Sequence, residues 1–454
     1  MSKNQLNTLD CFLSHLEGIF SVTLHDAREI IDAFHQEMRA GLAGMESSLK
    51  MIPSFVGPPK GTEKGRYLAL DLGGTNIRIL AVELDGKGNA SVSAVSRFVV
   101  PEQKMCGTGI ELFDYIAECI QLFLEEQGIS RQQTHDLAFT FSFPVEQHSL
   151  ASGKLIGWTK NFTASGVVGR DVVAMLAEAL KRKDLGCIHI VALANDTVGT
   201  FVAKCYSNPS CHMGVILGTG TNACYPEKVA HILKCPDPGP FGEMIINMEW
   251  GGFSWLKMNH YDRDLDCASH NAGKQHLEKM VSGMYLGEIA RQVIVDMMTR
   301  GLLFRETNLS VFSKEYILHT EHLSLVAQGS DFFADFGLRE VSETDGQAVR
   351  KLCQIVSTRS ARIAGAAIAA VVTWMDATVE HDHIIAIDGT LFEKYPGYRD
   401  HLLEILRELF GKRATRIKLE LVKDGSGMGS AVIGAVAASA RRQGAYRQNR
   451  LRPI

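Results

Sequence analysis

Short apolar runs, each followed by a glycine-rich polar segment, recur along this chain. Apolar runs of this length that end at glycine are typical of buried strands leading into tight turns. The runs are 67–70, 215–217, 384–387 and 417–422, and they lead into 71–76, 218–222, 388–390 and 424–429 respectively. A folded core does not need four strands that end this way, whereas a site that closes around a phosphorylated ligand does. We therefore expect the four glycine-rich turns to serve one site.

The rest of the pattern alternates helices with strands. Helices are expected over 1–64 and 110–127 and after 429, further strands over 77–83 and 137–143, and a hairpin turn at 85–86. A proline- and glycine-rich stretch at 53–65 separates the first helices from the first strand. The triplet Gly-Thr-Asn at 74–76 recurs at 220–222, each time after a strand. Alternating strands and helices favour an α/β fold, and the weak repeat suggests two related halves.

Composition and charge narrow the class of protein. The chain has 454 residues, of which 46% are apolar, enough for a sizeable core and for two or three domains. A formal net charge of −4 gives no reason to expect nucleic acid or an anionic membrane as a partner. The longest apolar stretch, 363–374, is shorter than the roughly 20 residues of a membrane span. Residues 1–20 are amphipathic and lack a signal-peptide pattern, so we expect a soluble, cytoplasmic protein.

Cysteine and histidine give no sign of a metal centre. The 10 cysteines include no CxxC pair, so reduced, buried thiols are expected. The 16 histidines are scattered, and although His381 and His383 flank Asp382, no further residues complete a zinc-like spacing. We therefore look for chemistry elsewhere in the sequence.

The first glycine-rich turn has the groups that a nucleotide polyphosphate requires. Glycine lets backbone N–H groups approach an anion closely. Asp71 at the strand end can hold Mg²⁺ through water, since Mg²⁺ prefers oxygen ligands and keeps several waters. Arg78 adds a fixed positive charge. Taken alone, 73–74 could equally be a plain hairpin turn, and only the four turns together favour a phosphate site.

Two other nucleotide-binding motifs are disfavoured. The P-loop pattern GxxxxGK[ST] is absent from the sequence. Residues 218–223 fit the dinucleotide fingerprint GxGxxA, which must be followed by a helix. Here Cys224-Tyr225-Pro226 comes next, which is not a helix start, so a dehydrogenase is disfavoured.

Polar side chains suited to the ring hydroxyls of a sugar occur at several separate positions. They are Ser142, Thr159, Lys160, Asn195, Asp196, Asn222, Glu249 and Glu278. Each has an ordinary alternative, such as a surface acid for Glu249, a turn former for Asn195 or a solvated side chain for Lys160. Asp196 is the exception, because it follows the apolar run 188–194. A carboxylate at the end of a buried strand usually has a partner or a function.

These segments together resemble the hexokinase family. Residues 70–78 look like its first phosphate motif, and 141–144 with 155–162 are similar to its sugar-binding signature. The further matching segments, in the order found in the family, are 195–200, 218–225, 247–251, 278–288, 388–390 and 424–427. The match extends from about residue 60 to 440, and its motifs are long and specific.

The resemblance implies the duplicated, ribonuclease H-like fold of the actin-like ATPases, with a small and a large lobe around a cleft. We place the small lobe at 65–195 plus 426–454 and the large lobe at 1–64 plus 196–425. The implied activity is transfer of the γ-phosphoryl group of Mg-ATP to the 6-hydroxyl of glucose or a related hexose, the first step of glycolysis. A monomer or homodimer is expected, with no nucleic acid or membrane partner.

Residue roles carry over from the family by position. Asp196 matches the general base, and Lys160 is expected to orient the sugar or the γ-phosphate. The sugar contacts are the eight residues named above. The ATP contacts are Asp71, Gly73, Gly74, Thr75, Asn76, Arg78, Thr219, Gly220, Gly389 and Thr390, with Thr320 and Ser324 as less secure additions. Asp71 is also the expected Mg²⁺ residue, through water.

The sequence departs from the family pattern at two positions and leaves two alternatives open. Met284 and Met428 stand where members often carry a basic residue near ATP, which bears on ATP affinity rather than on the chemistry. One alternative is a kinase of the same fold for another sugar or for glycerol. The other is a sugar sensor without turnover, although the base and the phosphate turns are intact. We expect one catalytic unit without a regulatory half or mitochondrial anchor. The sequence does not choose among glucose, mannose, fructose and glucosamine.

Overall fold

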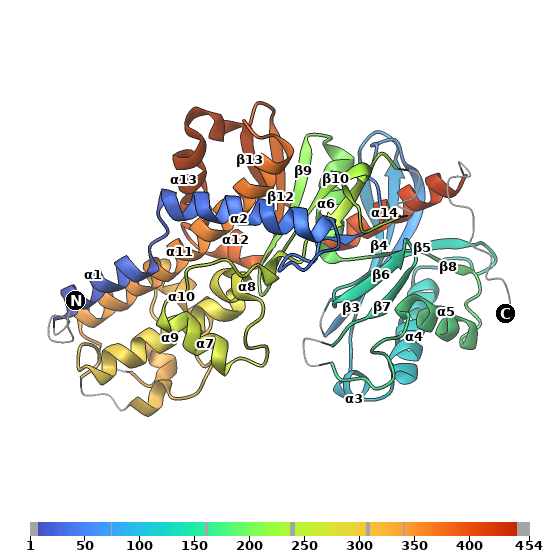
Figure 1. Ribbon diagram of the computed structural model, residues 1–454. Helices are drawn as coiled ribbons and strands as arrows, with labels where there is room; N and C mark the ends of the chain where they lie inside the picture. Colours follow the sequence, from blue (N-terminus) through green and yellow to red (C-terminus); the bar gives the residue numbers. More distant parts are fainter. Residues whose placement is uncertain are drawn as a thin grey trace.

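Two groups of elements, each built on one β-sheet, make up the protein (Figure 1). This computed structural model describes residues 8–73, 75–158, 162–236, 241–305, 309–338 and 341–442. In Figure 1 the group with strands β3 to β8 lies on the right, and the group with α1, α2 and α7 to α13 lies on the left. The lobe boundaries given above remain predictions.

The first sheet has five strands in the order β4-β3-β2-β5-β8. Strands β2, β5 and β8 are parallel, whereas β3 and β4 pair antiparallel beside them. Helices α4 and α5 pack on one face, and Thr108 and Glu111 form a capping box that begins α4. The bounds are β2 (Lys64–Leu72), β3 (Asn76–Asp85), β4 (Ala90–Val99), β5 (His135–Phe141), β8 (Ile188–Ala194), α3 (Glu102–Cys106), α4 (Gly109–Glu126) and α5 (Val172–Arg182), with a separate hairpin of β6 (Val145–Ser149) and β7 (Ser152–Leu155).

The second sheet repeats this topology. Its order is β1-β11-β10-β9-β12-β13, so beside the edge strand β1 the five remaining strands have the order and directions of the first sheet. The repeat falls at the same connection in both sheets, because residues 75–76 lie between β2 and β3 or begin β3, and residues 220–222 lie between β9 and β10 or begin β10. The predicted relation between two halves is therefore confirmed. The bounds are β1 (Ile52–Pro53), β9 (Cys211–Leu217), β10 (Thr221–Lys228), β11 (Glu243–Asn247), β12 (His383–Asp388) and β13 (Ile417–Leu421).

Helices α6 (Asp196–Ser207) and α14 (Gly425–Arg442) pack against each other between the two sheets. Their apolar side chains share a core with Tyr67 and Ala69 of β2 and with Ile384 and Ala386 of β12. The helices follow β8 and β13, so the chain enters this interface from the carboxyl end of one strand in each sheet.

One sequence prediction is wrong here. Residues 424–429 were expected to form a glycine-rich turn, but α14 already begins at Gly425. The glycines serve helix packing, because a Cβ on Gly429 would lie 1.8 Å from the carbonyl oxygen of Gly199 on α6. A Cβ on Gly199 would in turn meet the Ser426 backbone at 2.8 Å. The absence of side chains brings the two helices into backbone contact.

The remaining helices belong to the group of the second sheet, where most of them pack against one long helix, α11. They are α1 (Leu9–Phe20), α2 (Leu24–Leu42), α7 (His260–Ala268), α8 (His276–Val281), α9 (Gly283–Thr299), α10 (Thr320–Ala327), α11 (Glu343–Met375), α12 (Thr390–Lys394) and α13 (Tyr398–Phe410). Helix α11 contains the apolar stretch 363–374 and, by length and composition, is the one described helix that could cross a membrane. Most of its apolar stretch is buried inside the protein, as in the core helix of a globular fold.

All ten cysteines are free thiols, as predicted. The prediction that they are buried is wrong for Cys11, Cys106 and Cys267, which are exposed.

Candidate active site

Three asparagines and one glutamate from three different elements join in a hydrogen-bonded group. Asn222 on β10 donates through Nδ2 to Oδ1 of Asn247 at 2.8 Å and to Oε1 of Glu249 at 3.3 Å. Asn247, at the end of β11, donates to the same Glu249 oxygen at 2.9 Å. The Asn195 side chain caps α6 by accepting from Thr197 N at 2.9 Å, and it lies 3.5 Å from Asn222. Amides and a carboxylate that are fixed in this way are suited to the hydroxyls of a sugar.

The backbone conformation of Glu249 supports a binding role for this group of side chains. Its φ of 53° lies in the left-handed region, which a non-glycine residue adopts at a cost of about 1–3 kcal/mol. Such strain persists where the surrounding structure fixes it. Here two amides hold the Glu249 carboxylate from one side.

Glu278 on α8 reaches the same region from another direction. Its Oε2 accepts a hydrogen bond from Thr221 N at 3.1 Å, so it lies at the connection from β9 to β10. A Cβ on Gly220 would come within 2.8 Å of that oxygen, which explains why glycine stands there. The predicted sugar residues Asn222 and Glu278 and the predicted phosphate residue Gly220 are therefore neighbours.

Asp196 is the first residue of α6 and is half-buried. Its Oδ1 accepts from Thr197 N at 2.8 Å and from Thr197 Oγ1 at 3.2 Å. Among the described residues, none donates to its Oδ2. The carboxylate is thus oriented through one oxygen while the other remains able to accept a proton.

Arg78 joins the first glycine-rich turn to the start of α14. Its guanidinium pairs with Asp71 at 3.1 Å and with Asp424, and it also donates to Ser426 Oγ at 3.0 Å. Ser426 in turn donates to Asp71 at 2.9 Å. Burial raises the pKa of Asp71 above its ordinary value, an effect that Arg78 and Ser426 partly offset and the nearby Asp196 charge reinforces. The fixed positive charge predicted for Arg78 is present, but two carboxylates share it.

Asp388 adds a further acid at the end of β12. Burial raises its pKa to about 6, and the charges of Asp196 and Asp424 raise it as well. Asp71, Asp196, Asp388 and Asp424 therefore form an acidic group, defined by these four residues, around one guanidinium. An excess of carboxylate oxygens is the donor chemistry that Mg²⁺ prefers. Among the described residues, however, no three such side chains lie close enough together to hold a metal ion by themselves, so the expected Mg²⁺ would be held by Asp71 through water and by the phosphates of ATP.

The connections after β9 and β12 cross closely. Gly389 has a φ of 128°, and a Cβ there would lie 2.2 Å from the carbonyl oxygen of Leu217. A Cβ on Gly218 would lie 3.8 Å from the backbone nitrogen of Thr390, the first residue of α12. Thr219, Gly220, Gly389 and Thr390, all predicted to contact ATP, are thereby brought into one region.

Thr320 and Ser324 lie beside this crossing. Thr320 donates through Oγ1 to Gly283 O at 2.6 Å and accepts from Gly287 N at 3.1 Å, which fixes the first turn of α9. That turn is bonded to Thr219, because Met284 N donates to Thr219 O at 3.0 Å. Ser324 lies 3.5 Å from the carbonyl oxygen of Lys394, the last residue of α12.

The structure describes the positions of some of the remaining predicted residues, and the others lie outside the described residues. A Cβ on Gly73 would lie 3.5 Å from an Asp71 carboxylate oxygen and 3.8 Å from the Ser142 hydroxyl. Residues predicted to contact ATP and a residue predicted to contact the sugar therefore lie together at this turn. Thr75 and Asn76 are exposed beside this turn. Three predicted residues, Gly74, Thr159 and Lys160, lie outside the described residues.

Four residues of the site were not predicted as contacts. They are Asn247, Asp388, Asp424 and Ser426, all of which stand within motifs that the sequence had singled out. Asp388 has the same signal as Asp71 and Asp196, a carboxylate at the end of a buried strand. Asn247 gives no such signal, because its role depends on two residues that the fold brings to it.

Comparison with known proteins agrees with this arrangement. Two family models, both described as hexokinase, match residues 13–206 and 212–436. The solved hexokinase from Schistosoma mansoni complexed with glucose superposes with a TM-score of 0.84 and 36% identity, covering 96% of this chain and 100% of that one. A second hexokinase crystal structure gives a TM-score of 0.80 and 28% identity over 95% of this chain and 99% of that one.

The two sheets of one topology and these superpositions define the duplicated, ribonuclease H-like fold of the actin-like ATPases. The chain belongs to the hexokinase family. Hexokinase HKDC1 of Homo sapiens is 40% identical over 458 residues, which covers 95% of this chain but 48% of that protein. The chain thus spans about half the length of the curated relatives it matches.

Proposed function

We propose that this protein is an ATP-dependent hexokinase, which transfers the γ-phosphoryl group of ATP to the 6-hydroxyl of glucose and related hexoses as the first step of glycolysis. One observation carries the proposal. The amide and carboxylate group of Asn195, Asn222, Asn247 and Glu249 lies next to Asp196, whose charge acts on Asp71 at the first glycine-rich turn. A sugar-binding group and a phosphate-binding group are thus adjacent.

In this mechanism Oδ2 of Asp196 accepts the proton of the attacking sugar hydroxyl while Thr197 holds Oδ1. Glu249, Asn222 and Glu278 position the ring by hydrogen bonds, which converts the reaction into an oriented, effectively unimolecular step. Bound Mg²⁺ offsets negative charge on the phosphates of ATP. Arg78 adds its fixed charge at the same side of the site.

We also propose that the protein acts in the cytoplasm, as a monomer or homodimer, with Lys160 and Thr159 completing the sugar contacts. The sequence motif 155–162 supports the last point, and the net charge of −4 supports a soluble protein without nucleic acid partners. These proposals rest on sequence and composition alone.

The test is a coupled assay with ATP, Mg²⁺ and a panel of glucose, mannose, fructose and glucosamine, with glycerol as a further acceptor. We expect a 6-phosphate product from glucose and from at least one other hexose. No product from any hexose at saturating ATP would overturn the proposal. Glucose binding without turnover would identify a sugar sensor, and turnover of glycerol or another sugar alone would identify a different kinase of this fold.

A further inference from the structure

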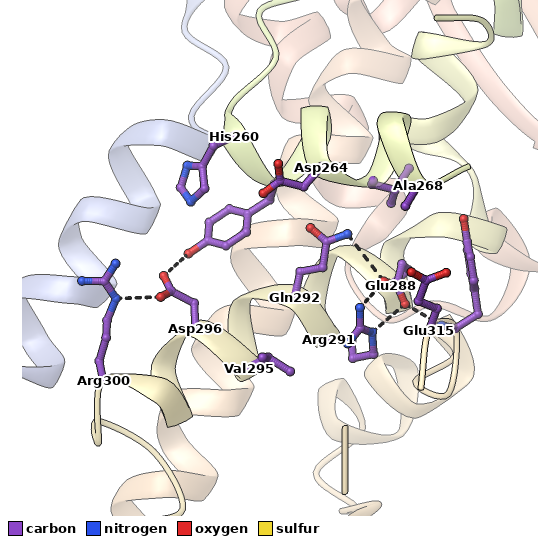
Figure 2. Close-up of a pocket in the computed structure, with 13 residues that line it drawn as sticks. His260, Asp264, Ala268, Glu288, Arg291, Gln292, Val295, Asp296, Arg300 and Glu315 are labelled. Carbon is purple, nitrogen blue, oxygen red and sulfur yellow. Dashed lines mark hydrogen bonds and ion pairs between the residues drawn. The ribbon is translucent and has the colours of Figure 1, made fainter. Parts of the chain in front are cut away.

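Two polar regions of the protein lie away from the site described above. One is a cavity of about 510 Å³ between α7 and α9, where the two arginines are held by carboxylates of the same cavity (Figure 2). The strongest donors of that cavity are thus satisfied within the protein itself. The other is a group of three histidines and one aspartate at the amino ends of β9 and β12. Its hydrogen bonds depend on protonation.

A β-bulge turns His212 of β9 toward the neighbouring strand. The strand pairing skips this residue, because the successive residues 384 and 385 of β12 lie opposite residues 211 and 213 of β9. Bulges of this kind re-aim a side chain. Here Nδ1 of His212 lies 2.9 Å from Nδ1 of His383, which begins β12 and is buried.

Asp376, which follows α11, sets the direction of this hydrogen bond. Its Oδ2 accepts from the backbone nitrogens of Glu380 at 2.7 Å and His381 at 2.9 Å, and the same oxygen lies 3.2 Å from Nε2 of His383. Burial alone would raise the pKa of Asp376, but these bonds hold it well below its ordinary value. A carboxylate only accepts, so Nε2 of His383 donates to it. Nδ1 of a neutral His383 is then an acceptor, and Nδ1 of His212 donates to it.

Protonation weakens this chain of hydrogen bonds. A proton on Nδ1 of His383 would set two N–H groups against each other across 2.9 Å. A proton on Nε2 of His212 keeps the bond but places a positive charge on a half-buried ring. Burial, and then the charges of His383 and His381, lower the pKa of His212 below 6.5. The fold therefore favours the neutral pair, and this contribution to stability is lost as the pH falls below about 6.5.

Charged groups on the neighbouring elements pair with one another rather than with the histidines. Lys204 on α6 pairs with Glu420 on β13 at 2.6 Å, and Lys418 on β13 pairs with Asp382 at 3.2 Å. The thiol of residue 211, next to the bulge, stays neutral because burial raises its pKa. The carboxylate of residue 380 belongs to an exposed side chain. In the part of the chain that the structure describes, the carboxylate that bonds to the histidine pair is that of Asp376.

The two strands joined by this pair lead into the candidate active site. β9 runs to the turn at 218–222 and β12 to Gly389, where a Cβ would lie 2.2 Å from the carbonyl oxygen of Leu217. Their carboxyl ends thus carry predicted ATP contacts, while the histidines join their amino ends. We propose that His212, His383 and Asp376 form an acid-sensitive link, in which protonation loosens β9 from β12 and weakens ATP binding. The effect on ATP rests on the proposed function, whereas the loosening does not.

The experiment is hydrogen exchange with mass spectrometry on the full chain without ligand, at pH 7.5 and 5.5. The test variant is His212→Gln. Its amide can donate to a neutral His383 or, turned over, accept from a protonated one, and it does not titrate. The matched control is His25→Gln, which replaces an exposed histidine on α2. Proteins are compared at the same pH, so that intrinsic exchange rates cancel. Thermal unfolding at pH 7.5 is the folding check, and His383→Gln is the second variant should His212→Gln not fold.

At pH 7.5 we expect equal exchange by all three proteins over 211–217 and 383–388. At pH 5.5 the wild type and the control should exchange about fivefold faster there than His212→Gln, as expected for the loss of one hydrogen bond. Equal exchange by the wild type and His212→Gln at pH 5.5 would overturn the acid-sensitive link. Faster exchange of the wild type spread equally over the first sheet would overturn it as well, because that result means general acid unfolding.

Steady-state kinetics test the consequence for the nucleotide. Between pH 7.5 and 6, the KM for ATP should rise more in the wild type than in His212→Gln, because the titrations of ATP and of Asp196 are common to both. An equal rise would overturn the transmission to the ATP contacts. Failure of the proposed hexokinase function would instead appear as no turnover by any of the proteins at pH 7.5, and hydrogen exchange would still decide the link.

Discussion

Among single residues, substitutions of Asp196 and Glu249 distinguish the chemical step from sugar binding most clearly. Asp196→Ala removes the proton acceptor but leaves the amide group intact, so we expect kcat to fall by on the order of 10²–10⁴ with little change in the hexose KM. Glu249→Ala leaves sugar hydroxyls and the Asn247 amide without an acceptor, so it mainly raises KM. Steady-state kinetics on both variants, after circular dichroism shows them folded, decide the assignment. Retention of more than about a tenth of kcat by Asp196→Ala would rule it out as the base.

Asn247 is expected to act by positioning Glu249 and Asn222. It lies between them with bonds of 2.8 and 2.9 Å, and it is buried. Asn247→Ala leaves Glu249 and Asn222 joined only by their own 3.3 Å hydrogen bond, so they are held less firmly. We expect the hexose KM to rise about tenfold while kcat changes less, since one buried hydrogen bond is worth about 1–1.5 kcal/mol. Asn89→Ala, at the exposed hairpin between β3 and β4, is the control and leaves KM unchanged. A fall in kcat without a change in KM would contradict the positioning role.

The free energy of unfolding is expected to depend on pH through the Asp388 carboxyl group. Its pKa in the folded protein is raised to about 6 from 3.8, so its protonated form favours folding. That contribution is complete below about pH 4 and is lost as the pH rises through about 6. Asp388→Asn should therefore raise the free energy of unfolding at pH 7 by about 1–2 kcal/mol, less than the full shift implies because solvent screens the carboxylate.

The measurement for Asp388 is urea unfolding of both proteins at pH 4, 5, 6 and 7. The advantage of the asparagine variant should grow across this series. A variant less stable than the wild type at pH 7 would mean that a favourable partner holds the ionised carboxylate.

Much of this site could be predicted from the sequence, because its residues stand at strand ends that apolar runs mark out. Asp71, Asp196 and Asn222 were found in that way. Asn247 and Asp424 were not, since their roles arise from contacts with residues that lie far away in the sequence or on other elements. Asp424, for example, pairs with Arg78 across the interface between β3 and the start of α14.

Among the elements, the contact between α6 and α14 is where sequence reasoning failed. The glycines at 425–429 have the composition of a turn, and only the neighbouring helix shows why small residues stand within a helix. Local propensity disfavours glycine inside a helix, but backbone contact with Gly199 requires it. A single sequence does not reveal which helix lies opposite.

Two alanine substitutions on α14 test this explanation. Gly429→Ala places a Cβ 1.8 Å from a carbonyl oxygen and should destabilise the protein by about 1–3 kcal/mol. Gly434→Ala is the matched control, because its Cβ would meet neighbours no closer than 3.5 Å and alanine favours a helix. Urea unfolding compares them. Equal effects of the two substitutions would show that the helices do not lie in backbone contact at Gly429.

For the whole molecule, the arrangement of the site implies that a bound sugar draws the two sheets together. Ser142, Asp71 and Arg78 belong to the side of the first sheet, whereas Glu249 and Glu278 belong to the side of the second. A hexose that bonds to both sides therefore favours a more closed arrangement, and closure also excludes water as a competing nucleophile. We expect glucose alone, without ATP, to reduce the radius of gyration in small-angle scattering.

The control is Glu249→Ala with Glu278→Ala, which removes the carboxylates of one side and leaves Ser142 on the other. At a glucose concentration that saturates the wild type, this variant should keep the radius of gyration of the unliganded protein. A measurement in sucrose at the same concentration corrects for the change in solvent density.

A wild type that binds glucose with an unchanged radius of gyration would contradict sugar-driven closure. Equal compaction of the double variant would show that the glutamates on α8 and after β11 are not what couples the two sides. The structural reason to expect a difference is that Asn222, which donates to Glu249 on the side of the second sheet, lies 3.5 Å from Asn195, which follows β8 of the first sheet.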